Sequence, residues 1–307
     1  IENDLRRVLA YSLNNQLGFM VVGVGVGTEL ALNGTAAHAF THILYKALLF
    51  MSMGAVLLRT GTCKGSELGG LYKSMPWTTG FCIVGAASIS AFPLFSGFVS
   101  KSMILSALGY EGHWFTWGVL LFASAGVFHH SGIKIPYFAF FAHDPGIRCK
   151  EAPFNMLLAM GITAFLCVAI GVYPTALYDI LPHDVDYDPY STAHVINQLQ
   201  LLLFSALAFT FLMMTKLYPP ELKSTNLDTD YVYRRLLPRL IAWLSEGWSD
   251  VDRQGRQFLL RIVSVIINLT RKHHGIGGMM SRTHSAGTMV FWTLTIFLVF
   301  LVMYLAR

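Results

Sequence analysis

The sequence places three titratable side chains at intervals of four residues within one apolar stretch. His38, His42 and Lys46 lie in the segment H-A-F-T-H-I-L-Y-K-A-L-L-F. A helix brings residues at this spacing onto one face, because each step of four turns the side chain by only about 40°. A charged lysine in hydrocarbon is costly, so this face must contact protein or water. Titratable groups in such a position indicate an ion path.

A second segment combines a helix break with a lysine. In A-F-P-L-F-S-G-F-V-S-K, Pro93 and Gly97 fall at the centre of a predicted membrane span, and Lys101 lies one turn further on. Proline removes a backbone donor and clashes with the preceding turn, so we expect the helix to break there. Discontinuous helices mark ion sites in transporters. A simple packing kink is the alternative, and the adjacent lysine favours an ion path over it.

A third lysine inside a predicted span is Lys134, in F-H-H-S-G-I-K-I-P. It lies about two turns from the end of its segment, so its long side chain could also extend to the membrane surface. The neighbouring His129 and His130 are adjacent on a helix and cannot share a face. We predict that His130, four residues before Lys134, accompanies it in the ion path.

The composition is that of a membrane protein. The 307 residues are 54% hydrophobic and only 13% charged, with a mean hydropathy of +0.53, whereas a soluble domain carries about a quarter charged residues. The four cysteines form no C-x-x-C pair and have no metal-ligand spacing, so we expect neither disulfides nor a metal site. No pattern for flavin, haem, iron–sulfur or nucleotide is present. We expect no cofactor, no catalytic residue and no nucleic-acid partner.

Apolar windows predict seven membrane spans, each at or above the roughly 20 residues that a helix needs to cross the bilayer. Placing the first two arginines on the cytoplasmic side puts 18 of the 22 Lys and Arg residues inside and one outside, with three within the spans. This bias supports the orientation. The chain starts with Ile1 rather than Met, and we expect it to be part of a longer protein. The predicted spans are 8–28, 36–58, 80–108, 114–142, 153–174, 197–217 and 287–306.

The stretch 218–286 is polar and basic, and within it 231–272 has the pattern of one or two amphipathic helices. Pro238, Gly247 and Gly255 are expected to bend or divide it. With two tryptophans nearby, this arm suits the inner membrane surface. We predict four parts: a half-channel core at 1–175, an outer loop and additional transmembrane helix at 176–217, a cytoplasmic amphipathic arm at 218–286 and a final transmembrane helix at 287–307.

These motifs resemble the antiporter-like subunit family, shared by Mrp-type cation/proton antiporters and the proton-pumping membrane subunits of respiratory complex I and related hydrogenases. The matching pieces are D-L-R-R-V-L-A-Y-S at 4–12, the histidine helix and A-F-P-L-F-S-G-F-V-S-K-S at 91–102. The tail at 176–217 looks most like the D-type Mrp subunit. The resemblance implies an all-helical bundle, the second of two inverted five-helix repeats, with the first repeat preceding Ile1.

The resemblance also implies roles for individual residues. Lys101 corresponds to the lysine of the broken helix, which exchanges ions with the outer side. Lys46, His42 and His38 match the central hydrophilic axis of the family. Complex I relatives often have an acidic residue directly after the broken-helix lysine, whereas here Ser102 follows.

The sequence therefore predicts an ion-translocating, non-enzymatic subunit of a multisubunit Na⁺ or K⁺/H⁺ antiporter, working with other membrane subunits in a bacterial inner membrane. One alternative is a proton-pumping subunit of a complex I-type NADH:quinone oxidoreductase or a membrane-bound hydrogenase. Another is a non-conducting scaffold. A scaffold would hold its intramembrane lysines in fixed salt bridges, and the central stretches of the spans contain three lysines but no acidic residue.

Overall fold

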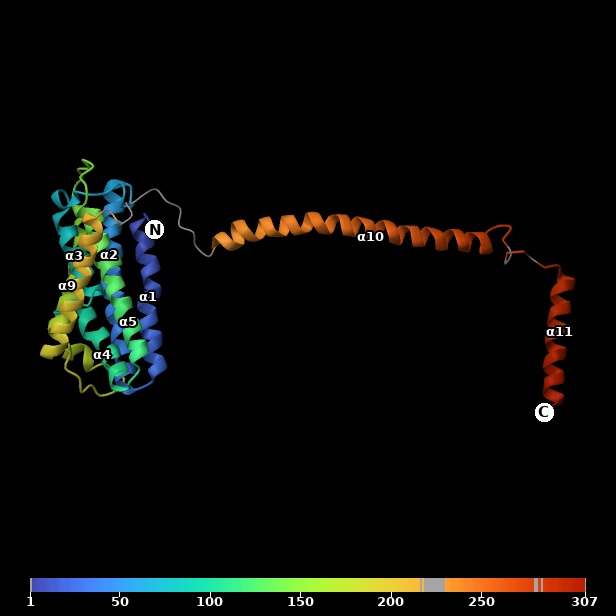
Figure 1. Ribbon diagram of the computed structural model, residues 1–307, viewed down its shortest axis with the longest axis horizontal. Helices are drawn as coiled ribbons and strands as arrows, with labels where there is room; N and C mark the ends of the chain where they lie inside the picture. The colour runs from blue at the N-terminus through green and yellow to red at the C-terminus, as the bar shows by residue number, and fades with distance from the viewer. Residues whose placement is uncertain (1, 216, 218–229, 279–280, 283, 307) are drawn as a thin grey trace. The chain divides into compact units, whose positions relative to one another are not determined.

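The computed structural model describes residues 2–215, 217, 230–278, 281–282 and 284–306. Within these ranges the chain forms helices and connecting loops, with no β-strand, as predicted. The helices fall into two compact units, Ile1–Asn226 and Leu227–Arg307 (Figure 1).

The first unit is a bundle arranged around one long central helix. This helix, α2, is 32 residues long and packs against α1, α3, α4 and α7. At 1.5 Å per residue it measures about 48 Å, which exceeds the roughly 30 Å hydrocarbon layer. The unit comprises α1 (Leu5–Val26), α2 (Glu29–Thr60), η1 (Leu71–Lys73), α3 (Pro76–Ile89), α4 (Ser96–Tyr110), α5 (Trp114–Val127), η2 (Phe128–Ile133), α6 (Lys134–Pro136), η3 (Tyr137–Phe141), α7 (Phe154–Val172), α8 (Thr175–Tyr178) and α9 (Thr192–Met214).

The start of α1 is fixed by a side-chain cap. The Asp4 carboxylate accepts the backbone N–H groups of Arg6 and Arg7 at 2.9 and 3.2 Å, which satisfies donors that the first helical turn leaves unpaired. The N–H of Leu5 donates to the carbonyl of Cys63 at 2.9 Å. These bonds tie the beginning of α1 to the loop that follows α2.

The predicted helix break is present. Helix α3 ends at Ile89 and α4 begins at Ser96. Pro93 lies within the break, and Gly97 lies in the first turn of α4. A Cβ atom on Gly97 would overlap the carbonyl group of Ser88, so the glycine allows the end of α3 and the start of α4 to pack backbone to backbone.

The predicted span at 114–142 is a continuous helical stretch that contains two wider turns. Helix α5 runs into the π-helical η2, the short α6 and the π-helical η3. Pro136 has no N–H to donate to the carbonyl four residues earlier, and local π adjustments are a known way to accommodate proline in membrane helices. These π turns were not predicted from the sequence.

Among the described residues, four helices are individually long and apolar enough to cross a membrane: α2, α7, α9 and α11 (Ala286–Leu305). They match four of the seven predicted spans. Two further predicted spans are divided into shorter elements, by the break and by the π turns. The remaining span corresponds to α1, whose 22 residues would measure about 33 Å.

The second unit contains η4 (Val232–Leu236), α10 (Leu237–His274) and α11. The amphipathic helix expected here is present as α10, a single helix of 38 residues. It is continuous through Gly247 and Gly255, so of the two alternatives, one helix or two, the structure has a single helix there. An interior glycine costs a helix only about 1 kcal/mol relative to alanine, which the rest of a long helix can offset. Pro238 lies two residues after the end of the π-helical η4, so it lies inside a continuous helical stretch, and the wider turn before it accommodates the missing N–H.

Candidate functional site

The predicted stripe on α2 lies inside the bundle. His38 is fully buried, Lys46 is 4% exposed and His42 is 7% exposed. Thr41 and Tyr45 are buried on the same side of the helix. By contrast, Ile43 is 66% exposed and faces outward. One face of α2 therefore carries polar and titratable groups into the interior of the first unit.

Helix α4 contributes a serine that joins this stripe. The Ser100 hydroxyl lies 3.0 Å from Nδ1 of His38 and 2.8 Å from Oγ1 of Thr41. Ser100 directly precedes Lys101 in the chain. The buried face of α2 is thus hydrogen-bonded to the helix that carries the predicted key lysine.

Tyr45 extends the connection to α1. Its hydroxyl donates to Oε1 of Gln16 at 2.9 Å and lies 3.4 Å from Nε2 of His38. Both nitrogens of the His38 ring therefore face a hydroxyl group. A histidine between two hydroxyls can accept a proton on one nitrogen and release one from the other.

His42 lies among aromatic rings. Its ring is stacked with His38 at a centroid distance of 6.2 Å and meets Tyr45 edge-on at 5.4 Å. The buried Nε2 atom of His42 has no hydrogen-bond partner among the described residues. One turn further along α2, the Nζ of Lys46 donates to the hydroxyl of Ser12 on α1.

Lys101 is anchored at the break. It is 1% exposed, and its Nζ donates to the carbonyl oxygen of Ile89 at 2.6 Å. Ile89 is the last residue of α3, and the final carbonyls of a helix have no partner within it and carry partial negative charge. The Nζ also lies 5.4 Å from the centre of the Phe19 ring, at cation–π distance.

The two lysines of this network have no acidic partner in the part of the chain that the structure describes. Among the described residues, neither Lys46 nor Lys101 takes part in a salt bridge. The place of the acidic residue that often follows the broken-helix lysine in complex I relatives is held by Ser102. Here a backbone carbonyl and an aromatic face stabilise the Lys101 ammonium group instead.

Lys134 lies elsewhere in the bundle. It is 2% exposed, and its Nζ donates to the backbone carbonyl of Glu2 at 3.2 Å, beside the start of α1. His130 is half-buried in η2, while the ring of its neighbour His129 packs against Phe209 of α9 at 5.0 Å. Lys134 is therefore bonded to a residue at the end of the bundle that is predicted to be cytoplasmic.

The uncharged members of the network were not predicted from the sequence; they are Ser12, Gln16, Thr41, Tyr45 and Ser100. Helical spacing in the sequence does indicate four of these five residues. Thr41 and Tyr45 follow His38 by three and seven residues, which is helical spacing, and Ser12 and Gln16 are four apart. The position of Ser100 depends on how α4 packs after the break, which the spacing of residues does not encode.

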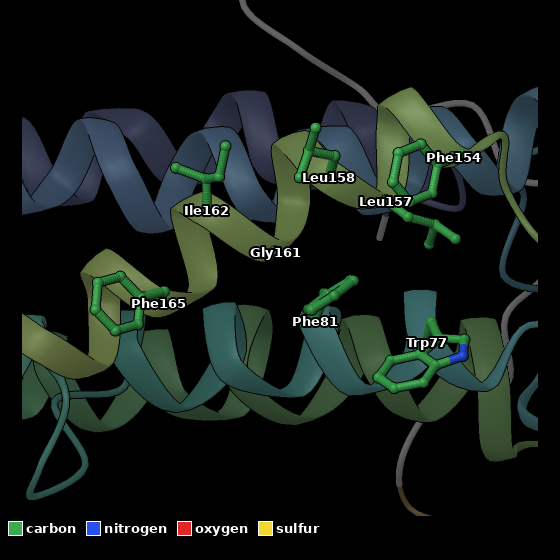
Figure 2. Close-up of a pocket in the computed structure, with 8 residues that line it drawn as sticks. All are labelled: Trp77, Phe81, Phe154, Leu157, Leu158, Gly161, Ile162 and Phe165. Atoms are coloured by element: carbon green, nitrogen blue, oxygen red, sulfur yellow. The ribbon is translucent and has the colours of Figure 1, made fainter.

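A groove of about 540 Å³ on the surface between α3 and α7 has a different character. Figure 2 shows aromatic and aliphatic side chains of the two helices facing one another across it. None of its lining residues is titratable, so the groove suits an apolar occupant and not an ion. It is lined by Trp77, Phe81, Phe154, Leu157, Leu158, Gly161, Ile162 and Phe165.

The residues of this network lie in a segment whose sequence is similar to a known family. The sequence pattern of the family described as "NADH:quinone oxidoreductase/Mrp antiporter, TM" matches residues 1–129. The match covers less than half of the chain, and over these residues the chain is similar to this antiporter-like family. They contain α1, α2, the break and Lys101, and so the whole polar network described above.

Two curated relatives are each similar to a part of the chain. The chain is 39% identical to the D-type subunit of the Na(+)/H(+) antiporter of Alkalihalophilus pseudofirmus over 111 residues, which cover 36% of this chain and 22% of the relative. It is 28% identical to hydrogenase-4 component B of Escherichia coli over 217 residues, which cover 59% of this chain and 30% of the relative. The matches thus span less than a third of either relative.

A solved structure shares the fold over nearly the whole chain. A chain of the Mrp complex from Dietzia sp. matches 97% of this chain with a TM-score of 0.60 and 22% sequence identity, and the match covers 34% of that chain. At this identity the likeness concerns the fold. It confirms the predicted all-helical membrane architecture.

Proposed function

We propose that this chain is an ion-translocating membrane subunit of a multisubunit monovalent cation/proton antiporter. The observation that carries the proposal is the buried polar network around His38, in which hydrogen bonds link α1, α2 and α4 beside the lysine of the broken helix. The similarity of residues 1–129 to the antiporter-like family supports it, as does the relative named as a D-type component of a Na(+)/H(+) antiporter.

The chemistry follows from burial. A medium of low polarity disfavours a charged lysine, so a buried lysine releases its proton more readily than one in water. The Ile89 carbonyl would hold the charged form of Lys101, and loss of the proton would weaken that hydrogen bond. Ser100, His38 and Tyr45 offer a relay of hydroxyl and imidazole groups next to it. Water would complete the connection to Lys46.

The wider setting of the chain is part of the proposal. Partner membrane subunits would supply the remainder of the antiporter, in a bacterial inner membrane with the orientation given by the Lys and Arg bias. Residues 1–175 would form the half-channel core and 176–217 an outer loop with one more helix. The arm at 218–286 and the last helix at 287–307 would brace the complex. Lys134 and His130 would serve the cytoplasmic end of the path.

One observation favours a second candidate function. The match to hydrogenase-4 component B covers more of this chain than the match to the antiporter relative. The same lysine and histidine chemistry could be driven by redox reactions in a partner protein instead of by an opposing ion gradient. Neighbouring genes for small antiporter subunits would favour the antiporter, and genes for iron–sulfur subunits would favour the redox-driven pump.

The experiment that tests translocation replaces Lys101 with Arg in the full-length complex. Arginine retains the charge and a donor for the Ile89 carbonyl, but it does not release its proton in proteins. We expect Lys101→Arg to assemble and to lose cation/proton exchange in everted vesicles. The matched control is Lys150→Arg, at an exposed loop position. Normal exchange by Lys101→Arg would remove Lys101 from the mechanism. The lysine would then have a fixed structural role, which favours the alternative of a non-conducting scaffold subunit.

A further inference from the structure

A recess lies between α4, α5 and α9. It has a volume of about 580 Å³ and lies in the outer half of the bundle in the predicted orientation, because α4 runs outward from the break and α9 starts at the outer loop. Its lining combines aromatic rings with neutral polar side chains and one histidine. The polar members are Ser106, His194, Asn197, Gln198 and Gln200.

One residue of the recess contacts the break directly. The Nε2 of Gln198, on α9, donates to the backbone carbonyl of Ser90 at 3.3 Å. Ser90 follows Ile89, whose own carbonyl holds the Nζ of Lys101. A polar side chain that lines the recess is therefore bonded to the residue next to the lysine's acceptor.

His194 lies one turn before Gln198 on the same helix. Its ring packs against Phe98 of α4 at a centroid distance of 4.9 Å, and Phe98 precedes Lys101 by three residues. The Nε2 of His194 is buried and has no hydrogen-bond partner among the described residues. A buried ring nitrogen in this state is a position that water or an ion in transit would satisfy.

The segment between α7 and α9, which includes α8, packs on α4 and on α2. The hydroxyl of Tyr178 donates to the carbonyl of Val99 at 2.9 Å, and Tyr187 lies 3.1 Å from the hydroxyl of Ser106. Asn33, on α2, exchanges two hydrogen bonds with the backbone of His183, at 2.9 and 3.0 Å. The segment therefore contacts α4 at Val99 and at Ser106, and Ser106 also lines the recess. The side that faces α9 carries the polar recess.

We propose that His194 and Gln198 form the outer mouth of the ion path, through which Lys101 exchanges protons with the outer side. This inference rests on the proposed function, since it gives the exit of the same path. It identifies α9, outside the segment that matches the antiporter-like family, as a contributor to the route. The occupant is water that carries protons.

Accessibility of introduced cysteines tests the mouth without relying on transport. The four native cysteines are first changed to alanine in the full complex. Two variants are then made, Gln198→Cys and Leu199→Cys. The side chain of Leu199 is exposed on the apolar surface and serves as the control position. A membrane-impermeant cationic methanethiosulfonate is added to the outer side. We expect Gln198→Cys to react roughly tenfold faster or more, because only a hydrated thiol forms the reactive thiolate readily.

Equal labelling of Gln198→Cys and Leu199→Cys would overturn the proposal that Gln198 lines the outer mouth, even if Lys101→Arg abolishes exchange. Labelling of Gln198→Cys with normal exchange in Lys101→Arg would instead overturn the proposed function. A second measurement addresses the histidine. His194→Ala should slow exchange several-fold, whereas His113→Ala, in an exposed loop on the same side, should not. Equal rates in the two alanine variants would exclude His194.

Discussion

The ammonium group of Lys101 lies 2.6 Å from the carbonyl oxygen of Ile89, across the break that separates α4 from α3. The lysine side chain of α4 thereby donates a hydrogen bond to a carbonyl at the end of α3 that has no partner within its own helix. This relationship gives Lys101 two roles, because the same hydrogen bond stabilises the break and holds the charge. Substitutions can separate these roles, since the first needs only a donor and the second needs a proton that can leave.

Replacing Lys101 with Met should therefore reduce stability as well as transport. Methionine fills much of the same volume but leaves the Ile89 carbonyl buried without a donor, which costs about 1–3 kcal/mol. We expect a lower midpoint of thermal unfolding for the purified complex with Lys101→Met than with Lys101→Arg. Equal midpoints for the two variants would show that the hydrogen bond does not support the break.

The histidine face of α2 gives a matched pair of substitutions. His42 is buried among rings, whereas the adjacent Ile43 is 66% exposed. Transfer of protons by a positioned side chain is often worth 10²-fold or more, so His42→Ala should slow exchange by at least roughly tenfold. Ile43→Ala should leave it unchanged. Initial rates of exchange in everted vesicles measure both, and similar losses in the two variants would mean that α2 acts through packing alone.

The sequence predicted the charged part of the network and the break that positions it. Charged and titratable residues are rare in membrane spans, so even a single one indicates a functional site. Proline breaks a helix through its own ring and missing N–H, whatever other segment packs against it. Lys101, the stripe on α2 and the break around Pro93 are therefore predictable from the sequence alone. Whether these residues carry ions remains a prediction.

The remaining features depend on contacts between distant segments. Ser100 joins His38 only because the break directs α4 against α2, and serine is too common in helices to attract notice. The sequence left open whether 231–272 forms one helix or two. Each glycine has a small local cost and helix formation is cooperative over many residues, so the pattern around Gly247 and Gly255 does not decide between them. The π turns around Pro136 are one of several ways in which a membrane helix accommodates proline, so the proline alone does not predict them.

Close packing of η2 against the break gives a further prediction. A Cβ atom on Gly132 would overlap the hydroxyl of Ser90, whereas one on Gly126, earlier in the same helical stretch, would meet no atom within 4 Å. Overpacking costs about 1–3 kcal/mol. Gly132→Ala should therefore lower the thermal midpoint and the rate of exchange, and Gly126→Ala should lower neither. An undisturbed Gly132→Ala complex would show that Ser90 can move without effect on the break.

The amphipathic arm is expected to support assembly and not transport. Phe258 lies on the apolar face of α10 and Ser264 on its polar face, and both are exposed within their unit. Phe258→Glu should reduce the yield of intact complex, because a charge on this face opposes burial in a membrane or against a partner. Ser264→Glu should not. Exchange per purified complex should stay unchanged in both, and a loss of turnover with normal yield would place the arm in the ion path.

The loop between η3 and α7 is held by a carboxylate whose pKa is shifted. Asp144 accepts hydrogen bonds from Arg148 at 2.8 Å and Lys73 at 2.9 Å, and these bonds hold the pKa of Asp144 well below its usual range. A lowered pKa in the folded state means that the unfolded chain binds the proton more readily. The stabilisation is therefore complete above the ordinary carboxyl pKa of about 3.9 and is lost as the pH falls through the lower folded value.

Asp144→Asn should accordingly lower the thermal midpoint of the complex by a small and constant amount between about pH 8 and pH 5, because Asp144 stays ionised in both states across that window. The difference from the unmodified complex should shrink only in more acidic solution. Asp186→Asn, at an exposed position of the outer loop, serves as the control and should change nothing. A difference that already disappears near pH 5 would mean that the bonds to Arg148 and Lys73 do not shift the carboxyl group, and that this loop is held by its other contacts.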